Sequence, residues 1–229
     1  MARALAEREG VRIEDDLLVG FKWIAHRIDQ AGHASFLFAF EESNGYLKGD
    51  HARDKDAAVG ALLFAELTAA AKDRKQTVLE YLDDLYIDVG HHGDRQINKS
   101  YPGREGLAKI KTLMKSLRDN PPRQIGGHAI KDVYDYKTHE IRALNRAEPP
   151  RPLPQPEGDL LIFHTDRPGT RFAARPSGTE PKIKFYLFAR TAVPGPEQLP
   201  AAKIETKRVL DQMAADLEVY LDEALRSAV

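Results

Sequence analysis

The sequence of 229 residues contains no cysteine. Disulfide bonds, thiolate metal sites and cysteine nucleophiles are therefore excluded together, and any catalysis must use oxygen and nitrogen groups. The sequence also has no excess of charge of one sign, because 34 lysines and arginines stand against 35 aspartates and glutamates. A balanced chain offers no field that would gather a polyanion. We therefore expect no nucleic-acid or membrane partner.

Long apolar runs are missing as well. No stretch reaches the roughly 20 apolar residues that a membrane helix requires, and no basic start with an apolar core and a cleavage site is present. These features predict a soluble, cytoplasmic protein. With 42% hydrophobic residues, the chain can bury the cores of two domains of ordinary size.

The first half predicts an α/β domain with a mixed sheet and helices. Residues 35–40 are almost continuously apolar and too few for most helices, which is typical of a strand buried on both faces. A charged loop follows, and then residues 57–72 carry apolar side chains at helical spacing behind Asp54 and Asp56, which can both serve as amino-terminal caps. In such folds ligands bind in loops that leave strands, so residues 41–56 are a candidate binding segment.

The second half predicts an α+β domain, an antiparallel sheet backed by helices. Successive strands are indicated over 160–165, 170–174 and 182–189, followed by a long amphipathic helix over 197–226. The last strand alternates between apolar and polar side chains, which are Ile183, Phe185 and Leu187 on one side and Lys182, Lys184 and Tyr186 on the other.

Helices are also expected over 77–85 and 103–117, and the proline-rich segment 148–158 reads as an extended surface connection. The domains are then expected at 1–100 and 123–229, with a helical connection over 101–122.

The loop between the last two predicted strands has a composition that suits a phosphate. Arg175 offers a planar fork of donors, Ser177 and Thr179 add hydroxyls, and Gly178 lets backbone N–H groups approach closely. A hairpin that uses turn residues for conformational reasons alone explains the same composition. The residues of this loop alone are therefore consistent both with a phosphate site and with a simple hairpin.

The adjacent histidines at 91 and 92 are a weaker candidate, for a metal site. Neighbouring side chains point apart in most backbones, and no third ligand stands at a suitable spacing. We expect an exposed loop there and no metal site in this chain.

Three segments together resemble the alpha-D-phosphohexomutases. Residues 175–186, RPSGTEPKIKFY, are similar to the phosphate-binding loop and following strand of the last domain of that family. EESNG at 41–45, followed by Arg-Asp-Lys-Asp at 53–56, is similar to the sugar-binding loop of the third domain. GFKWI at 20–24 resembles the loop that opens the third domain, although Val19 replaces the threonine of many members.

The resemblance implies the substrate-binding half of a phosphoglucomutase or phosphomannomutase, covering the third and fourth domains. Such enzymes interconvert sugar 1-phosphates and 6-phosphates through a sugar bisphosphate that reverses its orientation. The implied phosphosugar ligands are Glu41 and Ser43 for ring hydroxyls, Lys55 for a second phosphate or a nearby carboxylate, Arg175, Ser177, Gly178 and Thr179 for the phosphate, and Lys184 as a secondary ligand.

The catalytic loops of that family are not recognisable in this sequence. Relatives use a phosphorylated serine in the first domain and Mg²⁺ held by an aspartate-rich loop in the second. No Ser-His-Asn-Pro sequence occurs, and residues 88–95 do not fit the aspartate loop. We therefore expect no catalytic residue here and an inactive isolated chain, with Mg²⁺ and the bisphosphate belonging to the full-length enzyme and its amino-terminal domains. A phosphopentomutase of the same superfamily and a non-catalytic phosphosugar-binding or regulatory protein remain open.

Overall fold

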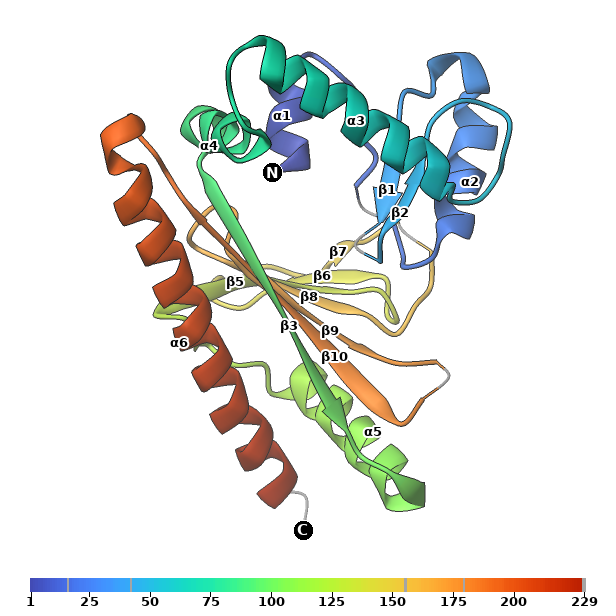
Figure 1. The fold of residues 1–229 in the computed structure, drawn as a ribbon. Coiled ribbons are helices and arrows are strands. Elements are labelled where there is room, and N and C mark those ends of the chain that lie inside the picture. Colours follow the sequence, from blue (N-terminus) through green and yellow to red (C-terminus); the bar gives the residue numbers. More distant parts are fainter. Residues whose placement is uncertain (16, 42, 155, 179, 228–229) are drawn as a thin grey trace. The chain divides into compact units, whose positions relative to one another are not determined.

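The computed structural model describes residues 1–15, 17–41, 43–154, 156–178 and 180–227. The chain divides into two compact units (Figure 1). The first unit comprises Ala2–Leu85, and the second comprises Tyr86–Val229 together with Met1. Within the described ranges, none of the helices combines the length and the apolar character that crossing a membrane demands.

The first unit is built from helices around a short hairpin. Its elements are α1 (Ala2–Arg8), α2 (Phe21–Ala31), the 3-10 turn η1 (His33–Ser35), β1 (Ala39–Glu41), β2 (Gly45–Leu47), α3 (Ala57–Asp73) and most of α4 (Val78–Val89). A small core gathers Phe21, Ile28 and Leu47. Of the two predicted caps, Asp56 is the one that caps α3, because its Oδ1 accepts from the backbone N–H of Ala58 at 2.8 Å.

The predicted strand over 35–40 is wrong in its length and burial. Residues 33–35 form η1, β1 begins only at Ala39, and Phe40 remains 51% exposed. The physical reason is that β1 pairs with β2 alone in a two-stranded sheet, so no second neighbour or covering layer buries the run.

The second unit holds an eight-stranded antiparallel sheet, with helices α5 and α6 over one face (Figure 1). The strand order is β3-β10-β9-β8-β5-β6-β7, with β4 paired to β5. The elements are β3 (His91–Ser100), α5 (Gly103–Asp119), β4 (Gln124–Ile125), β5 (His128–Asp135), β6 (Glu140–Ala143), β7 (Arg151–Pro152), β8 (Leu161–Thr165), β9 (Arg171–Pro176), β10 (Lys182–Thr191), the 3-10 turn η2 (Pro196–Gln198) and α6 (Leu199–Arg226).

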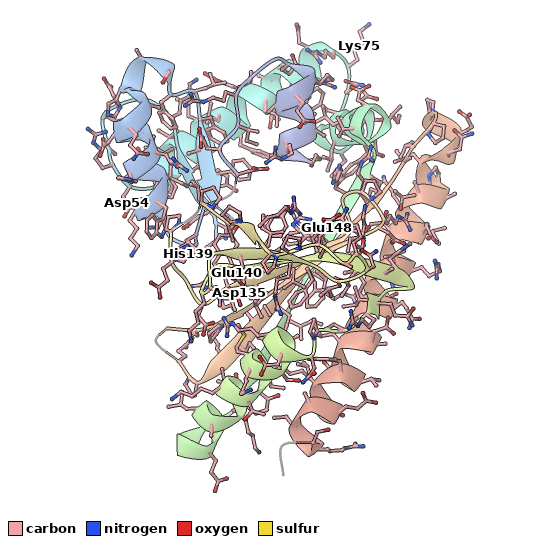
Figure 2. All side chains as sticks on the ribbon, turned by 180° about the vertical axis from the view of Figure 1, so that it is seen from behind. Asp54, Lys75, Asp135, His139, Glu140 and Glu148 are labelled. Atoms are coloured by element: carbon pink, nitrogen blue, oxygen red, sulfur yellow. The ribbon has the colours of Figure 1, made fainter. Side chains whose placement is uncertain are left out.

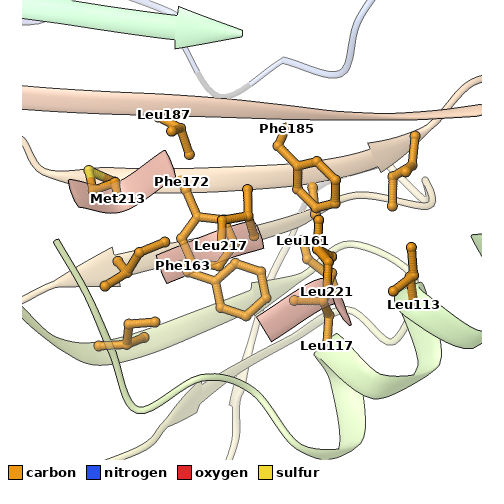
Figure 3. Close-up of a cluster of buried hydrophobic side chains, with 14 of the residues drawn as sticks. Leu113, Leu117, Leu161, Phe163, Phe172, Phe185, Leu187, Met213, Leu217 and Leu221 are labelled. Atoms are coloured by element: carbon orange, nitrogen blue, oxygen red, sulfur yellow. The ribbon is translucent and has the colours of Figure 1, made fainter. Parts of the chain in front are cut away.

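The core of the second unit lies between this sheet and its two helices (Figure 3). Phe163 and Phe172 stack at 4.2 Å between ring centroids, and Leu117 of α5 and Met213 of α6 are among the buried side chains around them. Burying each large apolar side chain contributes about 1.5–3 kcal/mol. The predicted alternation of β10 is confirmed, because its apolar residues are fully buried while Lys184 and its two polar neighbours are only partly covered.

The division between the units lies earlier than the domain limit predicted at residue 100. Strand β3 pairs with β10 over its whole length, from His91 opposite Thr191 to Ser100 opposite Lys182. Helix α5, expected as a connection, packs into the core of the second unit. Residues 86–122 therefore belong to the second unit by their contacts. The α/β class followed by an antiparallel sheet backed by helices is as predicted.

The histidine pair is part of this strand, so the expected exposed loop is wrong. Both His91 and His92 are partly buried in β3. Burial is the main cause that lowers the pKa of His92 to about 4, with nearby positive charge adding to the shift. His92 is therefore neutral at pH 7.

Candidate functional site

The ends of β9 and β10 that flank their connecting loop carry two cations on one face of the sheet. Lys184 lies directly opposite Arg175 in the antiparallel pair, and side chains in such a position project from the same face. Both are partly exposed. Across the described ranges, neither side chain forms an ion pair within 4 Å. Two opposed cations of this kind form a charge arrangement that an anion would relieve.

Two hydrogen bonds link the described residues of the loop beside these cations. The Ser177 N–H donates to the Lys182 carbonyl at 2.8 Å, and the Ser177 Oγ accepts from the Glu180 N–H at 3.3 Å. Gly178 faces open space, since a Cβ placed there would meet nothing within 4 Å. A ligand can therefore approach the backbone at this point. Thr179, expected as a phosphate ligand, lies outside the described residues.

Sequence reasoning missed an ion pair beside this loop. Lys182 Nζ pairs with the Glu180 carboxylate. The hydrogen bond from Lys182 is the main cause that lowers the Glu180 pKa, and the charges of Lys182 and Lys184 add to it. Glu180 is thus an anion close to Lys184, but its carboxylate is already paired with Lys182. The only sequence signal was their separation by one residue across the turn.

In the first unit, Glu41 and Lys55 are brought together over Gly45. A Cβ on Gly45 would lie 2.8 Å from Glu41 Cγ and 3.1 Å from Lys55 Cδ, so these side chains lie against the bare backbone. Glu41 is also the residue paired with Gly45 across the hairpin. Ser43 is exposed in the turn between the strands. Glycine at position 45 is what permits this close approach, and sequence reasoning had given it no role.

The Lys55 ammonium is oriented by two neighbours. Nζ donates to Asp54 Oδ1 at 3.0 Å and lies 5.8 Å from the centre of the Phe21 ring. The Asp54 hydrogen bond is the main cause that raises the Lys55 pKa, and the charge of Glu41 contributes. Asp54 itself projects from the surface of the first unit (Figure 2). Lys55 is therefore a cation beside a carboxylate, open to solvent on one side.

The other charges of the Arg-Asp-Lys-Asp run fix the local structure. Arg53 Nη1 lies 2.8 Å from Asp29 Oδ1, which ties the run to α2. Asp56 caps α3, and its N–H donates to the Tyr46 carbonyl at 2.7 Å. These contacts leave Lys55 as the cation of the run that is directed toward the Gly45 surface.

The predicted site residues thus form two groups, one in each unit. Glu41, Ser43 and Lys55 gather at the hairpin of the first unit, and Arg175, Ser177, Gly178 and Lys184 gather at the β9–β10 loop of the second. The first group offers hydrogen-bond acceptors and donors for hydroxyls, and the second offers charge-assisted donors for an oxyanion. Among the residues that the structure describes, no group of three His, Asp or Glu side chains could hold a metal ion.

Comparison with known proteins shows which family the chain resembles. Residues 1–88 match the family model described as phosphoglucomutase/phosphomannomutase, alpha/beta/alpha domain III. The phosphoglucomutase of Staphylococcus haemolyticus (strain JCSC1435) is 38% identical over 189 residues, which cover 82% of this chain and 34% of that protein. The phosphoglucomutase of Staphylococcus aureus (strain MRSA252) is 35% identical over 188 residues, covering 82% of this chain and 33% of that protein.

A solved structure shows the same fold. The open form of the Paramecium phosphoglucomutase pp63/parafusin superposes with a TM-score of 0.60 at 17% identity, covering 97% of this chain and 35% of that one. The chain spans about a third of the length of the curated relatives it matches.

Proposed function

Because the chain belongs to the alpha-D-phosphohexomutase superfamily and corresponds to its carboxyl-terminal domains, we propose that it is the substrate-binding half of a phosphoglucomutase or phosphomannomutase. The observation that carries the proposal is the opposed pair of cations, Arg175 and Lys184, beside an open glycine loop. Like charges directly opposite each other on a sheet are unfavourable in the free protein. A bound dianion would remove this repulsion.

The β9–β10 loop would hold the phosphate of the substrate. Arg175 can donate two parallel hydrogen bonds to two phosphate oxygens, and Lys184 adds a second positive charge. Ser177 supplies a hydroxyl, and the open side of Gly178 lets the backbone come close. These groups would recognise only the charge and the equivalent oxygens of the phosphate. The same loop could therefore bind a sugar 1-phosphate and a sugar 6-phosphate. That property suits a sugar that reverses its orientation during the reaction.

The hairpin loop of the first unit would hold the sugar. Glu41 accepts hydrogen bonds from ring hydroxyls, and Ser43 donates and accepts them. Lys55, kept protonated beside Asp54 and Glu41, would neutralise a second phosphate or orient the Glu41 carboxylate. A carboxylate that spans neighbouring hydroxyls can bind them in either orientation of the ring.

Phosphoryl transfer would be carried out by the rest of the full-length enzyme. The described residues do not fit a metal site, so Mg²⁺ is assigned to the remaining domains and no step is placed through it here. The sugar bisphosphate is the proposed intermediate of the complete enzyme. We place this enzyme in the cytoplasm and expect the isolated chain to bind without turnover, so conversion of glucose 1-phosphate by the pure chain would contradict this part of the proposal.

Calorimetric titration with glucose 6-phosphate tests the phosphate assignment. The variant Arg175→Ala should bind at least about tenfold more weakly than the unmodified chain, since one charge-assisted pair of hydrogen bonds is lost. Arg171→Ala is the matched control, because Arg171 is an exposed arginine of the same strand that lies 5.1 Å from the Phe188 ring. Equal affinities of the unmodified chain and Arg175→Ala would overturn the assigned phosphate loop.

A further inference from the structure

Strand β3 adds a third polar side chain to the row formed by Arg175 and Lys184. Lys184 of β10 pairs with Arg175 of β9 on one side and with Asn98 of β3 on the other. Residues paired in this way in an antiparallel sheet point to the same face, with their Cβ atoms about 4.5–5.5 Å apart. Asn98 is exposed, and β3 is the first strand in the order of the sheet. The row is therefore accessible to a ligand from the β3 side.

A hydrogen bond fixes the orientation of the Asn98 amide. Gln96 Nε2 donates to Asn98 Oδ1 at 2.8 Å. The two residues are two positions apart on β3, so their side chains lie on the same face of the strand. Because the amide group is planar, Asn98 Nδ2 points away from Gln96 when Oδ1 faces it. Among the residues that the structure describes, no protein acceptor is found for the Nδ2 donors.

The row thus presents three donor groups without an acceptor between them. Asn98 contributes the N–H groups of Nδ2, Lys184 an ammonium and Arg175 a guanidinium, and none of these groups can accept a hydrogen bond from another. The loop between β9 and β10 has one carboxylate, Glu180, and it pairs with Lys182. Neighbouring donors of this kind suit a ligand with several acceptor oxygens, and a phosphate monoester has three terminal oxygens.

The end of β3 is also attached to the β9–β10 loop. The Tyr101 N–H donates to the Pro181 carbonyl at 2.9 Å, three residues after Asn98. Between them, the pairing of β3 with β10 continues without a break as far as Ser100. Backbone hydrogen bonds therefore hold Asn98 at a fixed place beside the loop. A binding group that is already in place loses less conformational freedom when the ligand arrives.

We infer that Asn98 is a further ligand-binding residue of the phosphate site and that Gln96 is a positioning residue that acts through it. Asn98 Nδ2 donates a hydrogen bond to one oxygen of a phosphate bound by Arg175 and Lys184. Gln96 keeps the amide turned toward that oxygen. The donor is neutral, so it adds directional recognition of an oxygen without adding a third positive charge to the row. The inference rests on the proposed function, because it concerns the same phosphate site.

An NMR titration of the isotope-labelled full chain with inorganic phosphate reports on this contact directly. The side-chain NH2 signals of Asn98, assigned by comparison with Asn98→Ala, should shift together with the backbone signal of Gly178 and with the same midpoint. The NH2 signals of Gln124 are the internal control, because this exposed amide lies on β4, which pairs with β5. A shift at Gly178 with none at Asn98 would overturn the inference and leave the phosphate loop standing, whereas no shift at either residue would contradict both.

Calorimetric titration with glucose 6-phosphate measures how much the contact contributes. Asn98→Ala should bind about fivefold more weakly, since a hydrogen bond to a charged oxygen is lost. The dependence of the affinity on salt should stay as in the unmodified chain, whereas Arg175→Ala should reduce it, because of these two residues Arg175 alone carries a charge. Gln124→Ala is the matched control and should bind as the unmodified chain does. Unchanged affinity of Asn98→Ala, or a loss that comes with a weaker salt dependence, would contradict the assigned donor.

A double-mutant cycle tests the role of Gln96. Gln96→Ala should weaken glucose 6-phosphate binding about two- to threefold, and Gln96→Ala/Asn98→Ala should bind no more weakly than Asn98→Ala, because Gln96 acts through Asn98. Urea denaturation should give the variants midpoints close to that of the unmodified chain, since both side chains are exposed. Additive losses in the double variant would overturn the positioning role of Gln96.

Discussion

Lys184 on β10 stands directly across from Arg175 on β9, and both side chains emerge on the face of the sheet opposite to the core. The core-facing residues of the two strands alternate with them, as Phe185 and Ala174 show. The same alternation that buries the apolar side chains therefore forces two cations together beside the loop. This arrangement costs stability when no anion is bound, and it is where ligand binding and stability are linked.

Replacing one of the two cations should stabilise the free chain. Lys184→Gln is expected to raise the free energy of unfolding by about 0.2–1 kcal/mol at low ionic strength, because the repulsion across the strands is removed. Screening should shrink the gain at about 0.5 M salt. Urea denaturation at both salt concentrations measures this. Lys109→Gln on α5 is the control, as an exposed lysine of the same unit. Destabilisation by Lys184→Gln, or a gain that salt leaves unchanged, would contradict the repulsion.

The ion pair between Lys182 and Glu180 should keep the Glu180 carboxylate from pairing with Lys184 and competing with a bound phosphate. In Lys182→Ala, Glu180 loses its partner and can pair with Lys184, so glucose 6-phosphate should bind several-fold more weakly. The double variant Glu180→Gln/Lys182→Ala should recover most of the affinity, because the competing charge is gone. Calorimetry on the three proteins gives the comparison. Equal losses in the single and double variants would mean that Lys182 acts on the phosphate directly.

Gly45→Ala separates sugar binding from phosphate binding. The added methyl would lie 2.8 Å from Glu41 Cγ and 3.1 Å from Lys55 Cδ, which is closer than carbon atoms normally approach, so these side chains must shift. Affinity for glucose 6-phosphate should fall, while affinity for inorganic phosphate should stay the same because the β9–β10 loop lies in the other unit. A parallel titration with the two ligands decides the point. Loss of inorganic phosphate binding would show that the change acts through general unfolding.

The sequence predicted the elements whose patterns are strong. Regular alternation identified β10, helical spacing with a capping aspartate identified α3, and the composition of residues 175–181 identified the loop that the structure places beside the opposed cations. Each of these signals is local. A local signal is reliable because neighbouring side chains and the backbone alone decide the outcome.

The sequence did not predict features that depend on distant contacts. Strand β3 reads HHGDRQINKS, which lacks an apolar alternation, and it forms because an edge position next to β10 tolerates polar side chains. Its place in the second unit moved the domain limit. The role of Gly45 was invisible for the same reason, since it depends on where Lys55 returns after the hairpin. For residues 36–40 the sequence predicted a buried strand that the structure does not show. The apolar pattern would need a second neighbouring strand and a covering layer, which β1 lacks among the described residues.

The ion pair between Arg118 and Asp135 should be the most sensitive polar contact of the second unit. Arg118 Nε lies 3.0 Å from Asp135 Oδ2, with the two side chains 15% and 2% exposed, and Asp135 sits at the end of β5 (Figure 2). Arg118→Ala would leave that carboxylate buried without its cation, at a cost of about 3–5 kcal/mol in the free energy of unfolding. The exposed pair of Lys115 and Asp119 is the control, where Lys115→Ala should cost less than about 1 kcal/mol. Urea denaturation measures both, and equal costs would show that burial does not govern the Arg118 pair.

His164 should make the second unit less stable in mild acid. Burial is the main cause that lowers its pKa from 6.5 to about 4, the charge of Arg171 adds to the shift, and Asp132 opposes it. Between pH 6.5 and pH 4 the His164 imidazole is protonated in the unfolded chain but stays neutral in the folded chain. The free energy of unfolding therefore falls as the pH falls through that window. The contribution is complete above pH 6.5 and amounts to about 3 kcal/mol at most.

His164→Gln should therefore lose less stability than the unmodified chain between pH 7 and pH 4. His92, which has a similarly lowered pKa, is present in both proteins and cancels in the difference. An NMR titration that finds the His164 pKa near 6.5, or parallel stability profiles of the two proteins, would contradict the assigned burial.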